Sequence, residues 1–158
     1  MKYSQVYCLV AVAFLIAVLG CSPSRYIKTE PVEGYVTLDG EPVVGCTLVF
    51  FPVREGEGEP SFAVTDNRGF YRVATAGGRI DAGTIPGEYI VVFGLYEHVS
   101  TGRQTRDDDG NLVDVTREVS LLHRNYESRE RTPWRVTVQE GRNRFDFPLR
   151  SDGSGPSQ

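Results

Sequence analysis

The chain has 158 residues, a formal net charge of −4, and 17 basic against 21 acidic residues. Arginine outnumbers lysine by fifteen to two, and the arginines are scattered among acidic residues, so the chain lacks the clustered basic surface that nucleic-acid binding requires. The length fits one domain with a self-sufficient hydrophobic core, and three cysteines are too few for a disulfide framework.

The first 21 residues have the pattern of a targeting signal. Lys2 precedes an apolar run of 14 residues from Val6 to Leu19, and a Gly-Cys pair that ends in Cys21 follows the run. A positive start, an apolar middle and small residues at the cut are typical of a secretory signal, whereas a membrane-spanning helix needs about 20 apolar residues. A cysteine directly after the cut resembles the lipid acceptor of bacterial lipoproteins. We therefore expect a lipoprotein signal peptide over residues 1–20 and a lipid on Cys21.

Two alternatives remain open for this segment, namely an uncleaved membrane anchor and secretion without a lipid. With Cys8 in the signal and Cys21 lipidated, Cys46 is the one thiol left, so we expect no intramolecular disulfide. Ser22 stands where enteric bacteria place Asp to retain lipoproteins in the inner membrane. The sequence therefore favours a lipid-anchored protein of the cell envelope, in the outer rather than the inner membrane.

We expect little regular structure in the two flanks of the mature chain. Residues 21–31 contain two prolines and no apolar periodicity, as expected of a lipidated tether. Residues 150–158 are rich in Ser and Gly and cannot bury apolar surface, so we expect a disordered tail. The folded domain is then expected over residues 32–149.

Within the domain, short runs rich in Val, Thr, Phe and Tyr alternate with Gly, Pro, Asp and Asn, which is typical of an all-β fold. Asp39 and Gly40 predict a tight hairpin turn, and the turns at 66–69 and 140–142 predict two more hairpins. Seven short strands without intervening helices predict a two-layer β-sandwich. The seven are expected at 32–38, 47–52, 62–65, 70–75, 89–93, 134–138 and 143–149.

Residues 97–132 interrupt this rhythm, because they are longer than the loops that a compact domain normally tolerates. We expect one long insert before the last hairpin, with an exposed tip at 107–111. The apolar residues of 119–126 are expected to dock onto the sandwich as one helical turn. Long loops on rigid β scaffolds commonly carry binding sites, so a ligand site is expected first in this insert.

Several turn and strand motifs occur in a familiar order: GYVTLDGEPV at 34–43, VFFP at 49–52, TDNRGFY at 65–71 and PGEY at 86–89. A Leu-Leu…Tyr segment at 121–126 and a Thr-Pro pair at 132–133 precede the final strands. Over about residues 32–149 the chain resembles the carboxypeptidase regulatory-like domain family, and more closely the small bacterial lipoproteins that carry such a domain. The resemblance implies a seven-stranded, Greek-key β-sandwich of the transthyretin (prealbumin) type, and it brings no catalytic residue with it.

Candidate metal ligands are confined to the tip of the insert. Asp107, Asp109 and Asn111 offer the oxygen atoms that calcium prefers, yet the cluster lacks the bidentate Glu that closes a twelve-residue calcium loop. A solvated turn is the favoured interpretation, and a weak calcium site is the alternative. We expect neither a bound metal nor a cofactor.

No combination of residues predicts an enzyme. His98 and His123 have no zinc-site spacing, and no serine lies in a nucleophile motif. Asp66 precedes a turn and is expected to accept hydrogen bonds from the turn's backbone. Cys46 has apolar neighbours that would raise its pKa, so we expect a small buried hydrophobe. Transthyretin-related hydrolases need paired catalytic histidines and a C-terminal Tyr-Arg-Gly-Ser, which this chain lacks.

Three aromatic residues are the candidate ligand contacts. Tyr96, Tyr126 and Trp134 are expected to be exposed and able to stack on a sugar or a peptide, with a core or sheet-edge position as the alternative for Trp134. The sequence thus predicts a membrane-anchored lipoprotein whose non-enzymatic β-sandwich has a structural or protein-binding role at the cell envelope. A carbohydrate-binding module on the cell surface is the alternative, so the expected partners are the membrane, through Cys21, and an envelope protein or glycan.

Overall fold

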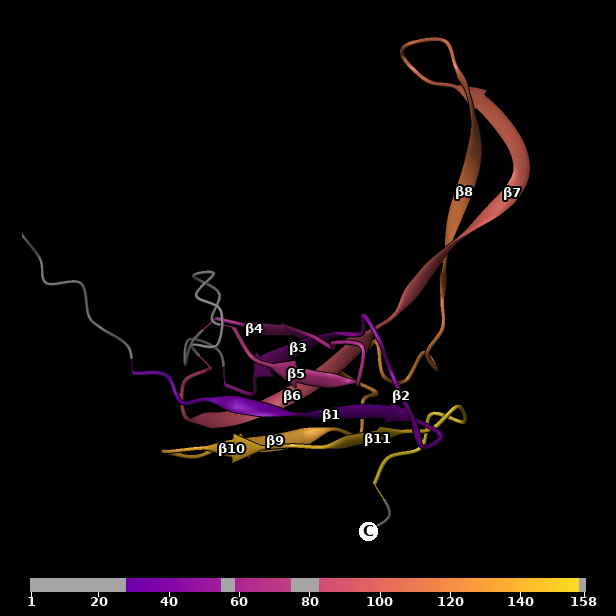
Figure 1. Ribbon diagram of the computed structural model, residues 1–158. Helices are drawn as coiled ribbons and strands as arrows, with labels where there is room; N and C mark the ends of the chain where they lie inside the picture. The colour runs from indigo at the N-terminus through magenta and orange to yellow at the C-terminus, as the bar shows by residue number, and fades with distance from the viewer. Residues whose placement is uncertain (1–27, 55–58, 75–82, 157–158) are drawn as a thin grey trace, which may run out of the picture.

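The computed structural model describes residues 28–54, 59–74 and 83–156 (Figure 1). The expected signal peptide, Cys21 and residues 22–27 lie outside these described ranges. The described ranges are all-β, as expected, and contain no helix that is long and apolar enough to cross a membrane.

All seven expected strands are present to within a few residues, but the described ranges form eleven strands in total. The last expected strand is split in two, and three further strands were not expected. In chain order the strands are β1 (Val32–Leu38), β2 (Glu41–Pro42), β3 (Thr47–Pro52), β4 (Ser61–Val64), β5 (Phe70–Arg72), β6 (Gly87–Gly94), β7 (Tyr96–Arg106), β8 (Leu112–Ser120), β9 (Arg135–Val138), β10 (Asn143–Arg144) and β11 (Phe147–Leu149).

Strand β1 is the common partner of four other strands in the first sheet. Strands β10 and β11 pair with it in parallel at one constant register, in which Val32 faces Asn143 and Val36 faces Phe147. Strands β2 and β5 pair with it antiparallel. The last strands of the domain therefore complete the sheet that the first strand begins.

The second sheet is antiparallel, with the strand order β4-β3-β6-β9. Its two most apolar strands, β3 and β6, occupy the central positions, as the near-continuous apolar sequence of each predicts. Alternate residues of β3 and β6 point into the space between the two sheets, and Leu48, Phe50, Val91 and Phe93 are completely or almost completely buried there.

One expected hairpin is confirmed, one is confirmed in part and one is wrong. Asp39 and Gly40 have φ angles of 51° and 96° and join β1 to β2 in a two-residue turn. The turn at 66–69 instead carries the chain from β4 in one sheet to β5 in the other, and one bridge between Phe62 and Ala74 still links the two segments. Likewise β9 pairs with β6, whereas β10 and β11 pair with β1. In both cases consecutive strands belong to different layers.

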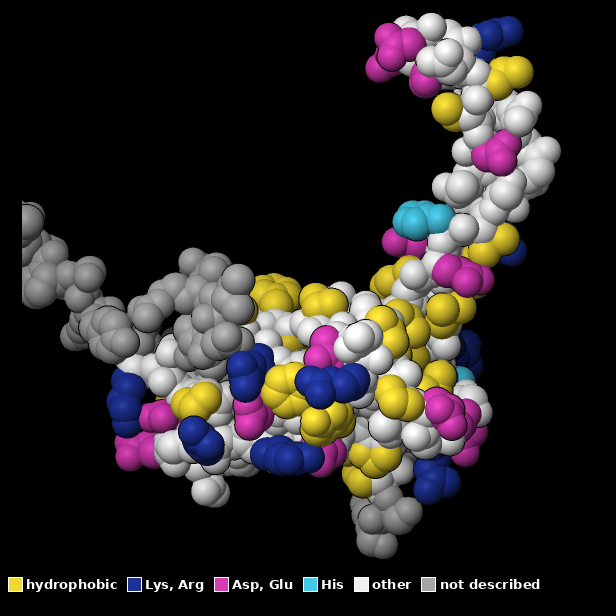
Figure 2. All heavy atoms as spheres, in the orientation of Figure 1, with side chains coloured by type: hydrophobic (Ala, Val, Ile, Leu, Met, Phe, Trp, Pro, Cys, Tyr) yellow, Lys and Arg dark blue, Asp and Glu magenta, His cyan; other side chains and the backbone are white. Residues whose placement is uncertain are grey.

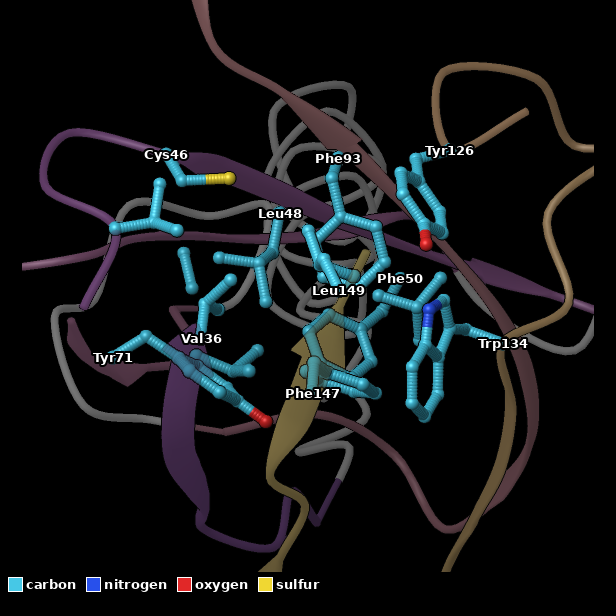
Figure 3. Close-up of a cluster of buried hydrophobic side chains, with 14 of the residues drawn as sticks. Val36, Cys46, Leu48, Phe50, Tyr71, Phe93, Tyr126, Trp134, Phe147 and Leu149 are labelled. Atoms are coloured by element: carbon cyan, nitrogen blue, oxygen red, sulfur yellow. The ribbon is translucent and has the colours of Figure 1, made fainter. Parts of the chain in front are cut away.

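A cluster of aromatic rings holds the two sheets together (Figure 3). The ring of Phe147 lies 5.1 Å from those of Phe93 and Trp134, 5.9 Å from Tyr71 and 6.3 Å from Phe50, measured between centroids. Phe147 and Tyr71 come from the first sheet, whereas Phe50 and Phe93 come from the second. The contact with Tyr71 is stacked and the other three are edge-to-face, and both kinds add to the stabilisation that burial alone provides.

The expected insert is a long two-stranded ribbon that projects from the sandwich (Figure 1). Strands β7 and β8 pair along their whole length, with one irregularity between Ser100 and Arg103, and the exposed tip falls at 107–111 as expected. After β8 the chain returns to the core, where Leu122 and Tyr126 are buried. This docking is confirmed for these two residues, whereas Val119 belongs to β8 and Leu121 is 45% exposed. The docked segment forms a hydrogen-bonded turn rather than a helical one.

Both flanks of the domain make more contacts than expected. Glu30 bridges Thr84 just before β6, and the Pro31 carbonyl accepts the backbone N–H of Asn143, so the end of the expected tether belongs to the sandwich. The tail is not detached over residues 150–156, because Gly153 is buried and the Tyr126 hydroxyl contacts the backbone of this segment. Residues 157–158 lie outside the described ranges.

The Phe147→Ala substitution tests the aromatic cluster. Removing a fully buried ring with partners in both sheets is expected to lower the free energy of unfolding by about 3–5 kcal/mol. Chemical denaturation of the full chain measures this loss. The matched control is Phe62→Ala, because that ring is 46% exposed, and its cost is expected to stay below about 1 kcal/mol. Equal losses for the two variants would contradict the central position of Phe147.

Candidate functional site

At the acidic tip of the ribbon, the carboxylate of Asp107 holds the turn. One oxygen of Asp107 accepts the backbone N–H groups of Asp109 at 3.1 Å and Asn111 at 2.8 Å, and the other accepts the Asn111 side-chain amide at 3.3 Å. The hydrogen bond from the Asn111 backbone is the main cause that lowers the pKa of Asp107. Both carboxylate oxygens of Asp107 therefore already accept hydrogen bonds from the protein itself.

The other two calcium candidates, Asp109 and Asn111, contribute backbone donors and one amide to this turn. Nowhere in the described ranges do three or more His, Cys, Asp or Glu side chains gather as a metal site would require. The geometry of the tip therefore supports the solvated-turn interpretation over a calcium site.

Two of the three aromatic candidates are not on the surface, which corrects their expected exposure. Tyr126 is fully buried, with its ring edge-on to Phe93, and its hydroxyl lies 2.6 Å from the Ser154 carbonyl oxygen and accepts the Arg150 backbone N–H at 2.9 Å. Trp134 is 7% exposed and packs edge-on against Phe147, so its core alternative is confirmed (Figure 3). Neither ring can stack on a ligand.

Tyr96 alone of the three remains accessible, with 50% of its surface exposed at the base of the ribbon. Its ring lies against Gly94, where an added Cβ would come within 3.0 Å of it. Partial burial, followed by the nearby carboxylates of Glu127 and Glu118, raises the pKa of its hydroxyl. One aromatic ring does not make a stacking platform for a sugar.

The residues with nucleophilic or basic side chains do not converge on a reactive centre. Cys46 is fully buried, and this burial raises the pKa of its thiol to about 12, so it stays protonated as expected. His98 faces Glu118 across the ribbon, whereas His123 lies in the turn that follows β8, where it accepts the Asn125 backbone N–H. The two histidines belong to different parts of the molecule.

Asp66 has the structural role that its position predicts. Its Oδ1 atom accepts the backbone N–H groups of Arg68 at 2.8 Å and Phe70 at 2.9 Å. These two hydrogen bonds are the main causes that lower the pKa of the Asp66 carboxyl. The same turn brings Gly69, with a φ of 75°, so close to the Val36 carbonyl that a Cβ would lie 2.5 Å from its oxygen. Asp66 thus fixes the crossing between the two sheets.

A hollow of about 250 Å³ lies where the chain enters the domain, beside β1 and β10. Its charged groups include Glu33 and Arg72, which form an ion pair at 3.2 Å. Its lining residues are Pro31, Val32, Glu33, Arg72, Val73, Arg142 and Asn143. Glu33 is the one carboxylate among them, and it is engaged by Arg72.

The sequence analysis predicted the insert, but it did not predict that the insert forms a ribbon with two distinct exposed faces. Because side chains alternate between the faces of a paired strand, the register places four valines on one side of the ribbon, which we call the valine face. Its members are Glu97, Val99, Arg103, Thr105, Val113, Val115, Arg117 and Val119. The period-two spacing of the valines in 113–119 is the sequence signal that could have revealed it.

Figure 2 shows the ribbon standing clear of the sandwich, with acidic side chains gathered at its tip. On the visible face of the sandwich itself, basic and acidic side chains are interspersed. No single-sign patch on this face suggests a polyanionic partner. The ribbon is thus the most distinctive exposed element of the described chain.

Comparisons with known proteins give little further information. No family model matches the chain, and no curated protein is similar to it. A solved structure, the 9R-lipoxygenase from Cyanothece PCC8801, aligns with 82% of this chain and 17% of its own length, at 14% identity and a TM-score of 0.32. The chain therefore spans less than a fifth of that enzyme, and a likeness this low carries no functional argument.

The pH dependence of stability tests the role of Asp66. A carboxyl whose folded pKa is lowered contributes stability above its unfolded pKa and loses it as the pH falls through the folded pKa. Asp66→Asn keeps an acceptor oxygen but has no charge to titrate. We expect its stability to fall less than that of the parent chain between pH 7 and about pH 3, as measured by urea denaturation.

Asp66→Ala is the matched control, since it removes the acceptor as well as the charge. It is expected to be less stable than Asp66→Asn at pH 7. A parent and an Asp66→Asn variant with the same pH profile would contradict the assignment.

Proposed function

We propose that this protein is a lipid-anchored protein of the bacterial cell envelope, whose β-sandwich binds another protein rather than catalysing a reaction. The observation that carries the proposal is the apolar run from Val6 to Leu19 followed by a Gly-Cys pair ending in Cys21. Ser22 in place of a retaining Asp favours the outer membrane. The envelope is thus the compartment in which a partner is to be sought.

A binding role is supported by how the polar side chains are used. Asp66 and Asp107 hold turns, Cys46 is buried, and the two histidines are separate. A catalytic site requires a nucleophile, a base and an orienting group within hydrogen-bond reach of one another. The described residues instead present an exposed ribbon, and exposed β elements on rigid scaffolds commonly serve recognition.

Membership in the carboxypeptidase regulatory-like family, with a Greek-key sandwich of the transthyretin type, is part of the same proposal. It is supported by the quoted turn and strand motifs, and two packed sheets without helices are compatible with it. No reactive residue comes with this family resemblance. The proposal of a non-enzymatic domain therefore does not depend on it.

The carbohydrate-binding alternative has lost most of its basis, because only Tyr96 of its three candidate aromatic residues is accessible. Sugar-binding modules use exposed aromatic faces as contact surfaces. A protein partner is therefore the better-supported proposal, and a sugar is kept as an outcome of the binding test.

Cys21→Ser tests the anchor. Metabolic labelling with a radioactive or clickable fatty acid is expected to label the parent chain, and the variant is expected to incorporate no label and to leave the membrane fraction. Cys46→Ser is the matched control, because it removes a cysteine that is buried in the fold, and it is expected to keep the label. Label retained on Cys21→Ser would contradict lipidation at this position.

Site-specific photo-crosslinking in intact cells tests the binding role. A photoreactive amino acid at Leu112, which is 60% exposed on the ribbon, is expected to give a discrete protein adduct in the envelope. The same group at Val44, which is 56% exposed on the sandwich, is the control position. An absence of protein adducts at both positions, together with retention of the chain on immobilised envelope glycans, would replace the protein-binding proposal with the carbohydrate one.

A further inference from the structure

We infer that the valine face of the ribbon is the binding site, and that its partner is an extended protein segment in which apolar and acidic side chains alternate. This inference rests on the proposed function and names its site and the chemistry of the partner.

The two faces of the ribbon differ in how many of their polar side chains have a hydrogen-bond or charge partner within the ribbon. On the face opposite the valines, the Gln104 amide donates to Asp114 at 3.0 Å, His98 lies across from Glu118, and the Arg106 guanidinium donates to the Gly110 carbonyl at 2.6 Å. The polar side chains of that face are therefore largely paired within it, and its apolar members are Tyr96 near the base and Leu112 near the tip of the ribbon.

The valine face combines four valines with Thr105 and three charged residues, Glu97 and two arginines. Val99 lies opposite Arg117, and Arg103 opposite Val115, on the two sides of the irregularity. Within the described ranges neither arginine takes part in an ion pair. A two-stranded ribbon has no second layer to cover such residues, and isolated two-stranded ribbons are only marginally stable in water. A partner that covers the four valines is therefore expected to stabilise the ribbon.

The charges of the face favour an acidic occupant, because its two arginines outnumber its one acidic residue, Glu97. Carboxylates are the natural partners of these arginines, because a guanidinium pairs with a carboxylate through two parallel hydrogen bonds.

The spacing selects an extended segment. Along β8 the face presents Val113, Val115, Arg117 and Val119 at every second position, which is the side-chain repeat of a β-strand. A partner strand that alternates apolar and acidic residues matches this repeat in both register and charge. Apolar contacts supply affinity, and the arginines supply specificity and faster association.

Two synthetic peptides serve as the probes, one of alternating Glu and Val and the other of alternating Lys and Val, each with seven residues and a fluorescent label. Binding to the purified full chain in detergent is measured by fluorescence anisotropy at low and high salt. We expect the acidic peptide to bind, the basic peptide to bind at least about tenfold more weakly, and the affinity for the acidic peptide to fall with salt.

The double variant Arg103→Glu with Arg117→Glu reverses the charge of the valine face. It is expected to lose affinity for the acidic peptide by about tenfold or more and to gain affinity for the basic one. Unfolding of the variant could explain a loss of affinity for the acidic peptide, but it could not explain a gain of affinity for the basic peptide. The matched control is Arg106→Glu on the opposite face, which is expected to change the affinity by less than about twofold.

The pair Val99→Thr and Val115→Thr tests the apolar half of the site with residues of similar shape and strand propensity, and it is expected to weaken acidic-peptide binding by about tenfold. Equal binding of both peptides by the parent, no binding of either, or an unchanged preference in the arginine variant would each overturn the inference. If one of these results is found, the proposed function still holds as long as the photoreactive group at Val44 gives a protein adduct in the crosslinking experiment. The proposed function fails separately if neither crosslinking position gives an adduct.

Discussion

The contact of the Phe147 ring with rings from both sheets is the interaction on which the rest of the structure depends. Phe147 lies near the end of the folded chain, yet it packs against Phe50 and Phe93 of the opposite sheet and against Tyr71 of its own. It reaches that position because β11 pairs in parallel with β1. The core is therefore complete only when the first and last strands have met, and this makes the sandwich a single cooperative unit.

That constraint explains where the polar side chains lie. A chain that crosses between two sheets must satisfy its backbone groups in the crossing turns, and buried or strained turns recruit side chains for this purpose. Asp66 supports the crossing from β4 to β5. Asn143 supports the crossing after β9, where its amide donates to the carbonyls of Gln139 at 2.9 Å and Gly141 at 3.0 Å. Asp66 and Asn143 are therefore both used to hold the turns at which the chain changes sheet.

The strand positions of the sandwich were largely predictable from the sequence, but those of the ribbon and the pairing of the strands were not. Alternation and turn residues located every predicted strand, since both are local properties of the chain. A turn such as that at 66–69 does not specify whether the next strand remains in the same sheet. Ala63 and Tyr71 both point into the core, but they do so from opposite sheets, and the hydrophobic pattern is identical in the two cases. Two crossings were therefore predicted as hairpins.

The candidate site was predictable only in part, for a related physical reason. The structural role of Asp66 and the burial of Cys46 follow from their immediate neighbours and were expected. The burial of Tyr126 and Trp134 depends on distant partners such as Phe93 and Phe147, which no local pattern reveals. The ribbon was overlooked because each valine of its face stands opposite a polar residue, so that neither strand has the strong apolar content of a core strand.

The direction in which the ribbon leaves the sandwich has one more consequence. The chain enters beside Thr84, at the end of the sandwich where β6 begins, and the ribbon leaves from the other end of β6 (Figure 1). Eleven residues of β7 extend it by roughly 35 Å. Under the proposed anchor at Cys21, the whole length of the sandwich would separate the attachment point from the ribbon, and the ribbon would be open to macromolecules other than the membrane itself.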